Sequence, residues 1–299
     1  MLAKGIKYIL LIMMAALLSP STVILGALPM RVLRRSYGRL PYWAGMLATA
    51  AVISAAGVPF WGLILLALTV ATGVYAEIEE QGGSAFLSGF GGILTAVGVS
   101  VLSVGAWVYT TGSHLLAEVR AQVAPMVASL TQVNTGAPAI TVDQVIQELP
   151  SGIVVALMVA LAIALIGESK LRNALRLSSE RPEGQPLKSF RVPDALVWAV
   201  ILTVLGAFFK HGIGWLQISS QNVFQVLMAV YFFQGLAVVA HVFESFKVSP
   251  LWQGLWYLVL VLQLFLAVSL VGFADYWLEF RSRLTGKPAT PDKNTNRSF

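Results

Sequence analysis

"SAFLSGFGGILTAVGVSVLSVGAWVYTT", residues 84–111, carries no charged side chain from one end to the other. A helix needs about 20 apolar residues to cross the hydrocarbon core of a bilayer. This stretch exceeds that length, and it therefore predicts a membrane-spanning helix. The fold then depends on how often such stretches recur along the chain.

The composition of the whole chain is that of a membrane protein. Hydrophobic residues make up 57% of its 299 residues and charged residues 11%, and the mean hydropathy is +0.76. Soluble domains carry about 25% charged residues. The short alternating segments of a transmembrane β-barrel are missing. We therefore expect an all-α, polytopic transmembrane helical bundle of about eight segments, built as a single domain over 1–286 with a disordered polar tail at 287–299.

The apolar stretches set the expected spans. They cover residues 6–29, 42–57, 60–76, 84–111, 151–167, 194–216, 221–242 and 251–274. The first could mimic a secretory signal, but it runs longer than a typical signal core and lacks a clean cleavage site. The second and third are shorter than a perpendicular span and could form one tight hairpin instead of two full spans.

Polar segments separate these spans. A polar insert lies at 112–150, where Thr141 is a plausible helix N-cap, and a basic loop lies at 168–193. The net charge of +6 is typical of cytoplasmic loops that face anionic lipid headgroups, not of a nucleic-acid partner. If every predicted span crosses the membrane, the three basic segments cannot all lie on one side. These segments are the loop at 30–41, the loop at 168–193 and the C-terminal segment. The orientation of the chain in the membrane therefore stays open.

Most ionisable residues near the spans fall at their predicted ends, where interfacial anchoring explains them. They are Glu77, Glu79, Glu80, Glu168, Asp194, Lys210, His211, His241 and Glu244. Uncharged polar groups within the apolar run at 221–242 are candidates for a ligand pocket, namely Asn222, Gln225 and Gln234. A buried amide demands partners, which could be a small ligand or a neighbouring helix.

Small residues recur every seven positions along 84–112. Gly91, Gly98 and Gly105 lie on this face, and such spacing allows another helix to approach closely. The partner could be another helix of this chain or a separate subunit.

Catalytic patterns are missing. The chain has no cysteine, and its three histidines have no metal-ligand spacing. No P-loop, H-E-x-x-H or G-x-S-x-G motif occurs. We expect no catalytic residue, no metal, no cofactor and no enzymatic activity.

The C-terminal segment "GFADYWLEFRSRL" resembles the closing signature of the YybS-like bacterial membrane proteins, a domain-of-unknown-function family. The matching positions are Gly272, Asp275, Phe280 and Arg281. Similar stretches occur at 25–38, 190–198 and 222–243, where Asn222, Gln234 and Gly235 match. The resemblance implies a distant relation to the substrate-binding S components of energy-coupling factor transporters, which have six spans and dock on a separate transmembrane-plus-ATPase module.

Two hypotheses follow for this expected protein of the bacterial inner membrane. In the first, it binds a small solute of unknown identity between its helices and acts with separate transmembrane and ATPase subunits. In the second, it is a non-transporting scaffold or assembly factor of the cell envelope. The first predicts that one small molecule stabilises the protein, and the second that none does.

Overall fold

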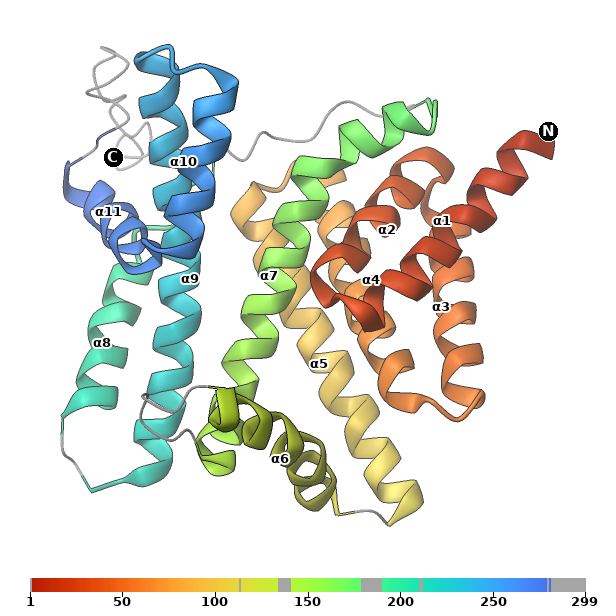
Figure 1. Ribbon diagram of the computed structural model, residues 1–299, viewed down its shortest axis with the longest axis horizontal. Coiled ribbons are helices and arrows are strands. Elements are labelled where there is room, and N and C mark those ends of the chain that lie inside the picture. The colour runs from red at the N-terminus through yellow and green to blue at the C-terminus, as the bar shows by residue number, and fades with distance from the viewer. Residues whose placement is uncertain are drawn as a thin grey trace, which may run out of the picture. The chain divides into compact units, whose positions relative to one another are not determined.

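A computed structural model describes residues 2–112, 114–133, 141–178, 190–209, 212–278 and 280. The chain divides into two compact units, Met1–Leu187 (unit 1) and Lys188–Phe299 (unit 2). All regular structure in the described part of the chain is helical (Figure 1). The expected all-α, polytopic architecture is therefore confirmed.

Unit 1 holds seven helices (Figure 1). They are α1 (Leu2–Ser21), α2 (Val23–Tyr37), α3 (Arg39–Ala55), α4 (Pro59–Glu80), α5 (Ala85–Thr111), α6 (Leu115–Val133) and α7 (Val142–Ala174). The predicted N-cap of α7 is confirmed, because Thr141 and Gln144 form a reciprocal capping box.

The expected first span, 6–29, is two helices that fold back on one another. Thr22 adopts an extended backbone between them, and the Ser21 hydroxyl donates to the Leu17 carbonyl in the last turn of α1. Gly26 permits the return, because a Cβ there would lie 2.4 Å from the Ser19 Oγ. The Tyr37 hydroxyl then donates to the Lys4 carbonyl at 2.6 Å, so the end of α2 lies beside the start of α1. The expected basic loop at 30–41 is thus mostly the last turns of α2 and the first turn of α3.

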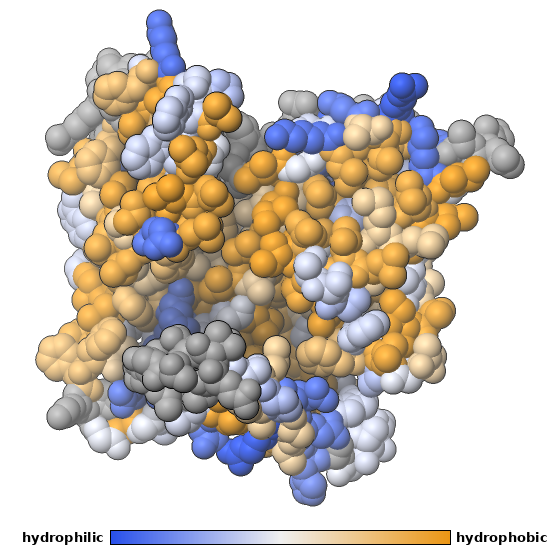
Figure 2. Space-filling view, in the orientation of Figure 1, coloured by the Kyte–Doolittle hydropathy of each residue, from blue (hydrophilic) through white to orange (hydrophobic). Residues whose placement is uncertain are grey.

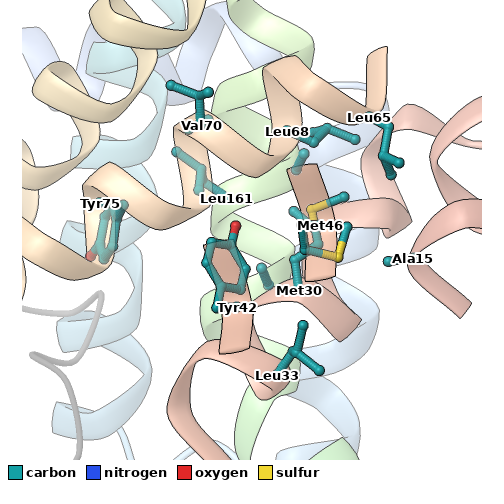
Figure 3. Packing of buried hydrophobic residues seen from close by; sticks show 14 of the residues in the cluster. Ala15, Met30, Leu33, Tyr42, Met46, Leu65, Leu68, Val70, Tyr75 and Leu161 are labelled. Carbon is teal, nitrogen blue, oxygen red and sulfur yellow. The ribbon is translucent and has the colours of Figure 1, made fainter. Parts of the chain in front are cut away.

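A hydrophobic core is formed by residues of the five helices α1 through α5 together with residues of α7. Figure 3 shows Met30, Tyr42, Met46, Leu68 and Leu161 converging between the helices. The Tyr42 hydroxyl is buried and donates to the Thr69 carbonyl at 2.7 Å, which satisfies the one polar atom of this ring. Figure 2 shows hydrophobic side chains over the middle of unit 1 and hydrophilic ones gathered towards its two ends.

Helices α4 and α5 pack through small residues, but not through the face that the seven-residue repeat predicts. The buried residues of α5 are Ala85, Ser88, Gly92 and Ala96. A Cβ on Gly92 would lie 2.6 Å from the Ala71 carbonyl oxygen, whereas a Cβ on Gly98 or Gly105 would meet nothing within 4 Å. Gly91 does approach α4, at the Ile78 side chain. The buried face of α5 therefore follows a spacing of three or four residues.

Five helices of the described chain are long and apolar enough to cross a membrane: Lys4–Ser21 within α1, then α4, α5, α7 and α9 (Gly214–Ser245). A sixth candidate is the pair α10 (Pro250–Leu262) and α11 (Phe265–Leu278), which bend by 99° at their junction. The expected span 251–274 is therefore broken at Gln263 and Leu264.

Unit 2 comprises α8 (Leu196–Phe208), α9, α10 and α11. The backbones of α9 and α11 touch, because a Cβ on Gly272 would lie 2.0 Å from the Tyr231 carbonyl oxygen. A Cβ on Gly235 would lie 2.1 Å from the Val268 carbonyl oxygen. Only glycine tolerates such distances, so these two residues position α11 against α9.

Candidate functional site: a buried arginine–glutamate network

Helix α2 directs three arginines into the interior of unit 1. Arg31, Arg34 and Arg35 follow an i, i+3, i+4 spacing, which places them on one helix face. These three arginines are only 1%, 0% and 7% exposed. Arginine is almost never fully buried unless it is paired, so each side chain needs a partner. The partners of these side chains come from α4 and α7, and together they form what we call the charge network.

The inner part of the charge network joins α2, α4 and α7. The Arg31 Nη2 lies 2.5 Å from the Glu79 Oε2, and the Arg31 Nε lies 3.0 Å from the Glu168 Oε2. Arg35 contacts the same two carboxylates, at 3.0 Å and 3.5 Å. Arg172, one turn beyond Glu168 on α7, adds a contact of 3.3 Å. Three guanidinium groups therefore share two buried carboxylates.

The outer part joins α2, α3 and α4. The Arg34 Nη2 donates to the Glu80 Oε2 at 3.0 Å and to the Glu77 Oε1 at 3.3 Å. Glu77 also accepts from the Trp43 indole at 3.1 Å and pairs with the exposed Arg39 at 3.0 Å. This part of the network reaches the surface, whereas the inner part is enclosed.

The carboxylates keep the buried guanidinium of Arg31 charged. Burial alone would lower the pKa of Arg31, but Glu79 and Glu168 act in the opposite direction and the net shift of the pKa is upward. The Arg31 guanidinium also lies over the Tyr75 ring, 5.0 Å from its centroid. Removing one partner from a buried ion pair leaves an uncompensated charge, which costs about 3 to 5 kcal/mol.

Some hydrogen-bonding capacity in the network is unused. The Arg31 Nη1 and the Arg34 Nε and Nη1 are buried and find no acceptor within the described residues. The Glu79 Oε1 likewise finds no donor there. Buried polar atoms are nearly always satisfied, so these nitrogens can donate to a further acceptor placed between α2 and α4.

The sequence showed the charged residues of this network, but it did not predict that they pair with one another. The sequence placed Glu77, Glu79, Glu80 and Glu168 at helix ends, where water and headgroups would solvate them. In the structure these four are ion-paired with the arginines of α2. The signal was the i, i+3, i+4 arginine triplet, which has the spacing of one helix face.

The expected ligand residues of unit 2 are spread along α9. The Asn222 Nδ2 donates to the Ile218 carbonyl of its own helix at 3.0 Å, and Gln225 is half-buried nearby. The Gln234 side chain is 4% exposed; its oxygen accepts from the Val192 N–H at 2.9 Å, and its nitrogen donates to the Gly272 carbonyl at 3.0 Å. The ligand role of these three residues stays a prediction. The two hydrogen bonds that Gln234 forms with Val192 and Gly272 join its helix to neighbouring segments of the same unit.

The positions that carried the family resemblance meet at the α9–α11 contact. The Asp275 Oδ1 accepts from the Phe280 N–H at 3.1 Å, and its Oδ2 lies 3.4 Å from the Gln234 Nε2. Gly272 supplies the close helix approach described above. Arg281 lies outside the described residues. The described part of this motif is therefore a junction of hydrogen bonds and backbone contacts.

Metal-ligating residues do not gather anywhere in the described part of the chain. No group of three or more histidine, cysteine, aspartate or glutamate side chains there could hold a metal ion. The chemistry of the charge network is instead that of guanidinium groups, which recognise carboxylates, phosphates and other anions.

One comparison with known proteins finds a family match. A family model described as "Predicted membrane protein (DUF2232)" matches residues 7–276, which include most of each unit and the charge network. No curated protein and no solved structure matches the chain. The match covers most of the sequence and agrees with the resemblance to an uncharacterised family of multi-pass membrane proteins. The chain therefore belongs to the predicted membrane protein family DUF2232.

Proposed function

We propose that this protein is a small-solute-binding component of a membrane transport system, similar in type to the S components of energy-coupling factor transporters. It acts in the bacterial inner membrane with separate transmembrane and ATPase subunits, and it catalyses no reaction itself. The observation that carries the proposal is the buried charge network. Ionisable residues inside a membrane protein are costly, and they commonly mark the path or binding site of an ion or solute.

The architecture of unit 1 is compatible with this role. Four of its helices, α1, α4, α5 and α7, hold segments long and apolar enough to cross a membrane, and α2 packs against three of them. Arginines from α2 face carboxylates from α4 and α7, so a solute that inserts among them contacts three helices at once. Its binding can thereby change how α2 packs against the other two.

The solute that fits this site carries an acidic group. Arg34 is fully buried and keeps two nitrogens without a described acceptor. A carboxylate or phosphate oxygen placed there gains charge-assisted hydrogen bonds. The proposed pocket therefore lies at Arg34 and Arg31, with α9 of unit 2 serving as a packing element.

Thermal unfolding of the purified protein in mild detergent tests the proposal. A panel of vitamins, metal ions, carboxylates and phosphate esters is added singly to the wild type, to Arg34→Gln and to Arg39→Gln. One acidic solute is expected to stabilise the wild type and Arg39→Gln but not Arg34→Gln. At 100 times its dissociation constant, a ligand adds about 2.7 kcal/mol of stability. A panel without any stabilising solute would count against solute binding.

A membrane scaffold is the second candidate, and a specific observation favours it. The charge network satisfies most of its own charges, and Gln234 is bonded to the backbone on both sides. Such internal bonding suits a rigid platform. A scaffold would show no solute-dependent stability, and it would be recovered from native membranes with envelope proteins instead of an ATPase pair.

A further inference from the structure

Unit 1 carries exposed or half-buried cations at the same end as the charge network. Lys4 and Lys7 lie in the first turns of α1, Lys170 lies near the end of α7, and Arg176 follows that helix. None of these four forms an ion pair with a described residue. We call them the basic collar.

The charge network explains why the basic collar is unpaired. Among the described residues, the acids at this end of unit 1 are Glu77, Glu79, Glu80 and Glu168. Each of them is bonded to an arginine of α2. Because the buried arginines occupy these carboxylates, the described part of this end of unit 1 offers the lysines no further acid to pair with. The described residues there therefore present an excess of positive charge.

The geometry around Tyr37 brings part of the collar together. The Lys4 Nζ lies 5.8 Å from the centroid of the Tyr37 ring. The Tyr37 ring packs edge-on against Tyr8, with 5.1 Å between centroids. The Lys7 Nζ reaches the Arg176 carbonyl at 3.5 Å. Lys4 thus lies against the Tyr37 ring, and Lys7, one turn further along α1, contacts the backbone of Arg176 at the end of α7.

This combination has the chemistry of a lipid headgroup site. Tyrosines are enriched at the membrane–water interface, and clusters of lysine and arginine beside a span attract anionic headgroups. Lys4–Ser21 within α1 and helix α7 are both long and apolar enough to span, so their ends lie at headgroup level.

We propose that Lys4, Lys7 and Arg176, which lie where the start of α1 meets the end of α7, bind the phosphate of an anionic phospholipid. Bound lipid would hold the start of α1 beside the end of α7. The proposal does not depend on solute binding or on transport.

Lipid retention tests this site directly. The full-length protein is purified in mild detergent and titrated with phosphatidylglycerol or phosphatidylcholine, and native mass spectrometry counts the bound lipids. Phosphatidylglycerol is expected to be retained in preference to phosphatidylcholine. The triple variant Lys4→Gln/Lys7→Gln/Arg176→Gln should bind it on the order of 100-fold more weakly, at roughly fivefold per cation removed.

Two controls make the result decisive. Arg120→Gln, at the other end of unit 1, should retain phosphatidylglycerol like the wild type. Added salt should weaken binding to the wild type, because exposed charges are screened. Equal retention of both lipids, or unchanged retention by the triple variant, would overturn the proposal. Displacement of the lipid by millimolar inorganic phosphate would assign the site to free phosphate and would equally overturn it.

Discussion

Arg31 of α2 and Glu168 of α7 are separated by 137 residues in sequence, yet the Arg31 Nε lies 3.0 Å from the Glu168 Oε2. The same carboxylate group also contacts Arg35 and Arg172. Glu168 is thus the meeting point of three guanidinium groups, and it ties the second helix of unit 1 to its last.

Replacing Glu168 should be costly for this reason. In Glu168→Gln the side-chain shape remains, but three buried arginines lose a carboxylate. We expect the free energy of unfolding to fall by about 3 to 5 kcal/mol. The measurement is tryptophan fluorescence during unfolding in mixed detergent and sodium dodecyl sulfate micelles.

Arg39→Gln is the matched control for Glu168→Gln. Its side chain pairs with Glu77 but is 67% exposed, so solvent screens the pair and its loss should cost less than about 1 kcal/mol. Equal stability losses in the two variants would show that the network is not buried as described.

The α9–α11 contact gives a second prediction. In Gly272→Ala, the new methyl group would lie 2.0 Å from the Tyr231 carbonyl oxygen, so the backbones must move apart. We expect a loss of about 1 to 3 kcal/mol of stability, measured by the same unfolding titration. Gly254→Ala in α10 should leave stability unchanged or raise it slightly, because nothing lies within 4 Å of the added Cβ. A neutral Gly272→Ala would contradict the backbone contact.

The sequence predicted features that depend on residues close together in the chain better than features that depend on contacts between distant helices. The span at 84–111 and the Thr141 cap follow from residues within a few positions of each other, and both are present in the structure. The break at Thr22 was missed because residues 6–29 were read as one apolar span, although Ser19, Pro20, Ser21 and Thr22 interrupt the apolar residues there. The charge network was missed because its pairing depends on which helices become neighbours. In unit 2, the sequence named Gln234 as a ligand candidate and Gly272 and Asp275 as positions of the family resemblance, but it did not predict that Gln234 contacts the other two.

Helix α5 has two faces through which it could pack, one with Gly92 and one with Gly98, and substitutions can tell them apart. In Gly92→Ala, the Cβ would lie 2.6 Å from the Ala71 carbonyl oxygen, whereas in Gly98→Ala it would meet nothing within 4 Å. We expect Gly92→Ala to lower the midpoint of thermal unfolding and Gly98→Ala to leave it unchanged. If a separate subunit covers the Gly98 face, Gly98→Ala would instead reduce recovery of that subunit while the purified chain stays stable.

The charges of unit 1 predict its orientation in the membrane. Lysines and arginines at the network end are Lys4, Lys7, Arg31, Arg34, Arg35, Arg39, Lys170, Arg172 and Arg176. The opposite end, around α6, carries Arg120 together with Glu118, Asp143 and Glu148. Because positive residues are retained on the cytoplasmic side, we expect the N-terminus and the charge network to face the cytoplasm and α6 to face the other side.

The natural chain has no cysteine, so single cysteines report this orientation without further engineering. Glu118→Cys and Lys170→Cys both replace exposed residues, on α6 and near the end of α7. A membrane-impermeant maleimide should label Glu118→Cys in intact cells, and should label Lys170→Cys only after the membrane is permeabilised. The reverse pattern would place the basic collar outside the cell. It would also remove the cytoplasmic leaflet as the source of the lipid proposed to bind there.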